Sequence, residues 1–203
     1  MKFSMAILMM LFGMFSVNAQ QETLFSNINH VGGFGGPMIE MSQVNGETVI
    51  DVGGGGGIIL DNFFIGGYGL GTDNASFETD VETFDIDFGH GGLWMGYVVP
   101  ANKVVHGYSS VKVGWGKTIL KDGKGDRAFS DNHIAILPEI GIELNITKWF
   151  RLAATGGYRI VNGLDDLPEG LDNDSFSGAF GSLTFRFGGF GYYRDNDHID
   201  EEF

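Results

Sequence analysis

The amino-acid sequence predicts an all-β protein, a single eight-stranded antiparallel transmembrane β-barrel. Three observations lead to this prediction. Apolar and polar residues alternate with period 2 in eight successive runs. Many of the 34 glycines lie within these runs rather than between them. The chain also begins with an export signal, and no later segment approaches the ~20 consecutive apolar residues that a transmembrane helix needs.

The N-terminal residues have the three parts of a secretory signal peptide. Lys2 gives a positive start, residues 5–17 are almost wholly apolar, and small residues precede Gln20. With this cleavage point the chain divides into a signal peptide (1–19), a short N-terminal segment (20–29), the outer-membrane β-barrel (30–190) and an acidic C-terminal tail (191–203).

Composition excludes several classes of function. The chain has no cysteine, so disulfides, thiolate metal sites, a cysteine nucleophile and a lipid attached to an N-terminal cysteine are excluded. The formal net charge is -14, which argues against nucleic acid as a partner because phosphate binding needs a basic surface. The many glycines suit the crowded interior of a narrow barrel, where small residues leave room for the few large ones.

Eight runs follow one another along the chain. We expect strands over residues 31–44, 47–60, 63–71, 84–99, 106–120, 133–146, 150–161 and 175–190. Asn45-Gly46 joins the first two and is a strong signal for a tight hairpin. Gly53 to Gly57 resembles a phosphate-binding loop, but no helix signal follows, and we interpret it as part of the second strand.

The sixth run shows the two faces most clearly. Its apolar face carries Ile134, Ile136, Pro138, Ile140, Ile142, Leu144 and Ile146. The fifth, seventh and eighth runs alternate in the same way, with Val111, Val113 and Trp115 in the fifth and Leu183, Phe185 and Phe187 in the eighth. We expect these apolar faces to meet lipid.

The opposite faces hold small residues and a few charged ones. The charged residues that we expect to pair with one another inside the barrel are Lys112, Glu139, Glu143, Arg151, Arg159 and Arg186. Eight strands enclose a space just wide enough for side chains to fill, so a packed, ion-paired interior is expected rather than a pore.

Connection lengths indicate an orientation. Outer-membrane barrels have short periplasmic turns and longer external loops. Residues 72–83, 121–132 and 162–174 are the long connections, and with a periplasmic N-terminus all three lie outside. The acidic stretch 165–174 has oxygen ligands for a divalent cation but lacks the spacing of a known calcium loop.

Three stretches carry a resemblance to a known family. They are residues 32–37 (GGFGGP), 137–151 (LPEIGIELNITKWFR) and 176–188. In this order, over nearly the whole mature chain, they resemble a family of small bacterial outer-membrane β-barrel proteins with the architecture of OmpX and the OmpA barrel. The resemblance implies fold and location, and it brings no catalytic residues. The acidic tail departs from the family pattern and leaves open whether Phe190 or Phe203 is the terminal assembly signal.

No motif predicts a cofactor, metal or catalytic residue. The phosphate-loop-like Gly116-Lys117-Thr118 has Val111 where that motif needs glycine, and the five histidines lack metal-site spacing. His106 with Ser109 or Ser110 is the one close Ser/His grouping, and nothing marks an orienting carboxylate.

The expected function is therefore a non-enzymatic outer-membrane protein with a structural or surface-interaction role through acidic external loops. Its expected partners are outer-membrane lipid, the barrel-assembly machinery and an external ligand. Three alternatives stay open: a narrow channel, a soluble lipocalin-like binder of apolar molecules, and an outer-membrane lipid-modifying enzyme.

Overall fold

A computed structural model describes residues 28, 30–78, 83–99, 103–165, 167–168 and 170–191. The predicted signal peptide and all of the acidic tail except Gly191 lie outside the described residues. So do three positions of the fourth connection, residues 100–102, and the acidic positions 166 and 169 of the last one.

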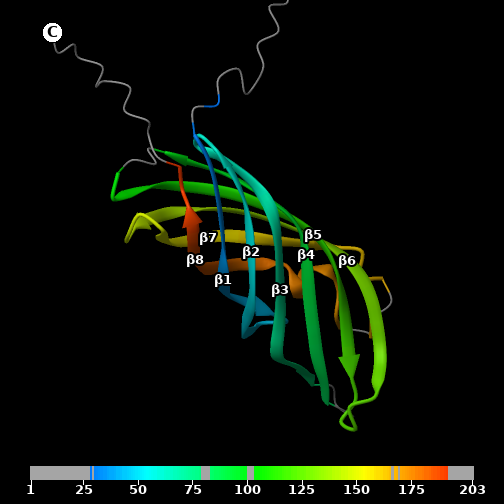
Figure 1. Ribbon diagram of the computed structural model, residues 1–203. Coiled ribbons are helices and arrows are strands. Elements are labelled where there is room, and N and C mark those ends of the chain that lie inside the picture. The colour runs from blue at the N-terminus through cyan, green and yellow to red at the C-terminus, as the bar shows by residue number, and fades with distance from the viewer. Residues whose placement is uncertain are drawn as a thin grey trace, which may run out of the picture.

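The described chain forms a closed antiparallel barrel in which each strand pairs with its sequence neighbours and β8 pairs with β1 (Figure 1). The strands are β1 (Val31–Val44), β2 (Glu47–Leu60), β3 (Phe63–Glu78), β4 (Thr83–Val99), β5 (Val105–Lys121), β6 (Arg127–Asn145), β7 (Phe150–Asn162) and β8 (Gly178–Gly189). A single helical turn, α2 (Asn173–Phe176), precedes β8. The predicted fold class is confirmed. Among the described residues, no helix has the length and hydropathy needed to cross a bilayer.

We call the end of the barrel where β1 begins and β8 ends the inner end, and the opposite end, with the hairpin at Asn45, the outer end. The inner end is uppermost in Figure 1. Asn45 and Gly46 have φ values of 51° and 82°. A two-residue hairpin requires such positive φ angles, so the predicted Asn-Gly turn is present.

Two predicted external loops are shorter than expected, because strand pairing takes up part of each: residues 79–82 of the first lie outside the described residues, and residues 122–126 of the second form the turn between β5 and β6. β3 extends to Glu78, with a register irregularity between Thr72 and Ala75, and β6 begins at Arg127. The extensions keep backbone pairing with β4 and β5, although residues such as Asp131 and Asn132 break the apolar alternation. Figure 1 shows the β5–β6 hairpin reaching well beyond the hairpin of β1 and β2.

Side chains alternate between an apolar exterior and a mixed interior. On β6 the exposed fractions are 54% for Ile134 and 73% for Ile140, whereas Leu137 is fully buried. Trp115 and Leu183 on β5 and β8 also face outward, with 68% and 43% exposed. The predicted direction of the isoleucine face is thus the observed one.

Glycines allow close approach of β2 and β3. Gly53 to Gly57 lie in β2, as predicted, opposite a glycine-rich part of β3. A Cβ atom on Gly66 would lie 1.9 Å from the carbonyl oxygen of Gly56. No larger residue fits there without moving backbone, so the glycines set the spacing of this part of the wall.

Two apolar clusters fill the ends of the interior. The inner cluster comprises Phe34, Met38, Ile59, Phe64, Tyr68, Leu70, Trp94, Val98, Tyr108, Ala153 and Phe190. The outer cluster comprises Val44, Val49, Ala75, Phe84, Ile86, Phe88, Leu120, Ala135, Leu137, Val161, Leu164, Leu171, Phe176 and Phe180. The buried polar side chains lie between and among these two clusters.

Candidate functional site

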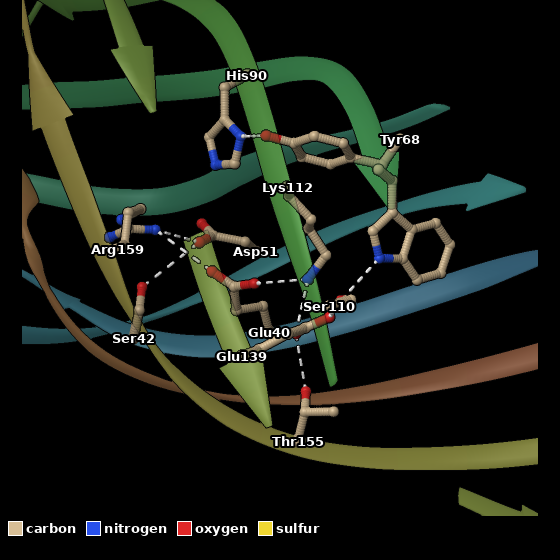
Figure 2. A network of polar contacts seen from close by, with 11 residues as sticks. Glu40, Ser42, Asp51, Tyr68, His90, Ser110, Lys112, Glu139, Thr155 and Arg159 are labelled. Atoms are coloured by element: carbon tan, nitrogen blue, oxygen red, sulfur yellow. Dashed lines mark hydrogen bonds and ion pairs between the residues drawn. The ribbon is translucent and has the colours of Figure 1, made fainter. Parts of the chain in front are cut away.

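A polar network crosses the middle of the barrel (Figure 2). Lys112 of β5 lies at its centre, with its Nζ 2.9 Å from Glu139 Oε2 and 3.7 Å from Glu40 Oε2. Glu139 also accepts hydrogen bonds from Ser110 and Thr155. All three charged side chains are at least 94% buried. Because each charge is desolvated, each needs these partners to remain in the interior.

Arg159 of β7 joins this network to the outer end. Its Nη1 lies 2.7 Å from Asp51 Oδ2 and 3.8 Å from Glu40 Oε1. Its Nε donates to the carbonyl of Phe176 at 2.9 Å, and its Nη2 donates to the carbonyl of Gln43. One planar guanidinium therefore connects β1, β2, β7 and the segment before β8.

A second ionic cluster lies toward the inner end around Glu143. Its Oε1 is 3.0 Å from Arg151 Nη1 and 3.0 Å from His106 Nε2, and its Oε2 pairs with Arg186. The other ring nitrogen of His106 is 3.0 Å from the carbonyl oxygen of Lys103. Both histidine nitrogens and both carboxylate oxygens are thus engaged in structural contacts.

The formal charges of the two ionic clusters cancel. The acids are Glu40, Asp51, Glu139 and Glu143, and the bases are Lys112, Arg151, Arg159 and Arg186, which gives 4 − 4 = 0. A neutral, cross-linked interior reduces the cost of burying eight charges. The arrangement favours a rigid filling and has no excess charge of one sign that would select ions.

Aromatic rings of the inner cluster surround Arg186, which belongs to the ionic cluster around Glu143. The guanidinium of Arg186 lies 3.6 Å from the ring centre of Phe34 and 4.7 Å from that of Phe64. Trp94 is fully buried beside them and donates from its indole nitrogen to Ser110 Oγ. A cavity of about 20 Å³ remains beside Arg151, Arg186 and other residues at this end. It has room for about one water molecule.

The outer end is closed by the described residues of the segment that follows β7, namely 163–165, 167–168 and 170–177, which we call the plug. Phe176 is fully buried and stacks on Phe88 of β4, with ring centres 5.3 Å apart. Leu164 and Leu171 are buried in the same outer cluster. Asp165, Asp172 and Asp174 of the predicted external connection are exposed, but its apolar side chains pack into the barrel mouth, which the sequence analysis did not predict.

Asp172 begins the helical turn of the plug. Its side chain accepts a hydrogen bond from the backbone N–H of Ser175, and the Ser175 hydroxyl bonds back to the same carboxylate. These hydrogen bonds, the backbone one foremost, hold the pKa of the Asp172 carboxyl below its ordinary value. The predicted eighth strand began at Ser175, but β8 starts at Gly178 because this cap forms a helical turn instead.

The structure divides the six predicted interior charges between two clusters and adds partners that the sequence analysis did not name. Lys112 with Glu139, and Arg151 and Arg186 with Glu143, pair within strands β5 to β8. Arg159 instead pairs with Asp51 and Glu40 across the barrel. Both acids stand on the polar side of a period-2 pattern in β1 or β2, which was the available signal for them.

The Ser/His grouping does not form a catalytic pair. Ser110 Oγ bonds Glu139 and Trp94, and Ser109 Oγ donates to the carbonyl of Tyr97. His106 bonds Glu143 and the backbone of Lys103. Within the described part of the chain, no three His, Cys, Asp or Glu side chains are placed to hold a metal ion.

Comparisons with known proteins give the fold. No protein-family model matches the chain, and no curated protein sequence matches it significantly. The crystal structure of Neisserial surface protein A (NspA) matches with a TM-score of 0.53 at 12% identity, over 78% of this chain and 94% of that one. The chain has the fold of a small outer-membrane β-barrel. That fold agrees with the location predicted from the sequence.

Two structures of Ail, the attachment invasion locus protein of Yersinia pestis, also match, each with a TM-score of 0.43. One shares 17% identity over 80% of this chain and 98% of that chain. The other, in complex with the heparin analogue sucrose octasulfate, shares 18% identity over 79% and 97%.

Proposed function

We propose that this protein is a non-enzymatic outer-membrane barrel that acts through its outer surface. The observation that carries the proposal is the filled interior: paired charges occupy the middle, aromatic side chains the inner end, and the plug the outer end. A barrel packed in this way leaves its outer hairpins as the surface available to an external ligand.

The apolar exterior supports a membrane location. Isoleucine, valine, leucine and tryptophan side chains stand exposed around the wall, as in Ile140, Leu93 and Trp115. A soluble lipocalin-like barrel would need charged residues of both signs there. Outer-membrane lipid and the barrel-assembly machinery are accordingly the proposed partners of the folded and folding chain.

The β5–β6 hairpin is the proposed contact surface. Residues 121–131 carry three basic and three acidic side chains, whereas Asp165, Asp172 and Asp174 belong to the plug. Lys124, Asp126 and Arg127 at the tip are exposed. The proposed ligand surface on this hairpin is therefore of mixed charge.

Cells that display the full chain test this proposal. We would replace residues 122–126 with an Asn-Gly turn and compare adhesion to other cells and to matrix-coated surfaces. We expect the shortened hairpin to reduce adhesion at least severalfold, while Lys148→Ala at the inner end leaves it unchanged. Equal adhesion by the wild type, the shortened variant and cells without the protein would remove support for a surface role.

A narrow channel is the main competing function. The fully buried Trp94 and Arg186 on the inner side and Phe176 on the outer side obstruct a continuous path. We expect planar bilayers containing the full chain to show no steady single-channel conductance at neutral pH. Stable unitary steps under those conditions would favour the channel.

A further inference from the structure

We propose that the plug is an acid-released closure, opened by protonation of two buried histidines beneath it, His90 and His133. This inference goes beyond the surface role and concerns how the outer end of the barrel is held shut. It rests on the contacts of the plug, on the hydrogen bonding of the two imidazoles and on the charges around them.

The histidines lie in one row across three strands, directly below the plug. His90 of β4 pairs with Gly116 of β5, which in turn pairs with His133 of β6. The ring of His133 stacks on Phe88 at 4.5 Å, and that of His90 meets Phe88 edge-on at 5.5 Å. Phe88 also stacks on Phe176 of the plug, so the two imidazoles and the plug contact the same aromatic ring.

Each imidazole has one nitrogen held and one nitrogen without a partner. His90 Nδ1 is 2.9 Å from Tyr68 Oη, as Figure 2 shows, and His133 Nδ1 is 3.1 Å from Thr118 Oγ1. Neither Nε2 atom has a hydrogen-bond partner among the described residues. Both histidines are buried: His90 is 5% exposed and His133 is 3% exposed. A protonated imidazole must donate from both nitrogens, and a buried N–H without an acceptor is costly.

The charged groups around the two histidines already have other partners. Arg159 of β7 and Lys112 of β5 are the bases near His90, and Arg159 and Asp131 of β6 are near His133. The acids that pair with these bases are Glu40 of β1, Asp51 of β2 and Glu139 of β6. Tyr68 of β3 and Thr118 of β5 contact the rings. Asp51 is paired with Arg159, and Glu139 with Lys112. Glu40 lies at ion-pair distance from both bases. Asp131 accepts from the backbone N–H groups of Asn132 and Asp165, the second of these in the plug.

Protonation therefore adds positive charge beside Arg159, whose guanidinium lies 4.9 Å from the Phe88 ring centre and holds the plug through the carbonyl of Phe176. Water can solvate the new N–H groups only if the plug leaves. The open state binds more protons, so its population rises as pH falls below about 6.5, where exposed histidine titrates, by up to tenfold per histidine for each pH unit. The closed state is favoured at neutral and higher pH.

The absence of cysteine permits a direct measurement of opening. Val161 is 2% exposed in the outer cluster, and Asp174 is an exposed residue of the plug. We would fold the full chain in lipid bilayers as Val161→Cys or Asp174→Cys and measure labelling by a negatively charged methanethiosulfonate. The rate at position 161 divided by the rate at position 174 removes the pH dependence of the thiol itself.

We expect this ratio to rise at least tenfold between pH 7.5 and pH 5.0. The rise should disappear in the double variant His90→Phe/His133→Phe and persist in His106→Gln, the histidine at the inner end. Heat-modifiable migration reports folding, and His90→Gln/His133→Gln replaces the Phe pair if that pair does not fold. A ratio that stays flat with pH overturns the proposal, as does an equal rise in the folded double variant.

Discussion

The guanidinium of Arg159 connects parts of the chain that are far apart in sequence. It contacts Asp51 and Glu40, and it donates to backbone carbonyls of β1 and of the plug. Removing the guanidinium leaves two buried carboxylates with less positive charge to neutralise them. It also removes the hydrogen-bond donor of two backbone carbonyls. Removing one partner of a buried ion pair destabilises the folded state strongly, even where the pair as a whole contributes little to stability.

We expect Arg159→Met to lower the free energy of unfolding by about 3–5 kcal/mol. Urea titration of the full chain in detergent or lipid gives this value. Arg159→Met combined with Asp51→Asn should cost less than the sum of the two single changes, because the buried carboxylate is no longer left unpaired. If the loss of unfolding free energy in the double variant equalled the sum of the two single losses, the two side chains would not interact.

The glycines of β3 provide a matched pair for the close packing of the wall. A Cβ on Gly66 would clash with the Gly56 carbonyl at 1.9 Å, whereas a Cβ on Gly69 has nothing within 4 Å. We expect Gly66→Ala to destabilise the barrel by roughly 1–3 kcal/mol or more, and Gly69→Ala to have little effect. Equal midpoints for the two variants in urea would contradict this account of the β2–β3 contact.

At the scale of elements, the plug depends on its short helical turn. The lowered pKa of Asp172 means that its capping interaction is present above the ordinary carboxyl value near 3.8 and is lost as pH falls through the lower folded value. This range lies well below that in which histidine titrates. The cap therefore stays intact while the acid release proposed for the plug takes place.

We expect Asp172→Ala to speed hydrogen exchange at the Ser175 amide severalfold at neutral pH, because that amide donates to the Asp172 carboxylate. Asp172→Asn should keep slow exchange, since asparagine also caps helices. If the alanine variant exchanged as slowly as the wild type, the cap would not be holding this turn in place.

The elements also show where sequence reasoning succeeds and where it stops. β1 and β2 have the predicted ends because Asn45-Gly46 specifies its turn. The outer parts of β3 and β6 were interpreted as loops because they lie beyond the apolar belt and lose its alternation. Backbone pairing with a neighbouring strand continues there without an apolar face, and a single sequence holds no direct signal for it.

At the scale of the whole molecule, the polar interior was predictable in kind but not in its connections. Period 2 placed Lys112 and Arg159 on the inward face, as observed. The pairing of Arg159 with Asp51 joins residues 108 positions apart, and it follows from closure of the barrel rather than from neighbouring strands. The plug was missed because Leu164, Leu171 and Phe176 are isolated apolar residues in an acidic, turn-rich stretch.

The central claim is that the apolar face of each strand meets lipid while the other face fills the barrel. The most direct measurement places single nitroxide labels along β6 of the full chain in bilayers, using the absence of native cysteine. Labels at Ile136, Ile140 and Ile142 should collide with membrane-dissolved oxygen, and labels at Ala135 and Leu137 should be shielded. Collision with a water-soluble nickel complex at the isoleucine positions, or oxygen exposure without period 2, would contradict the account.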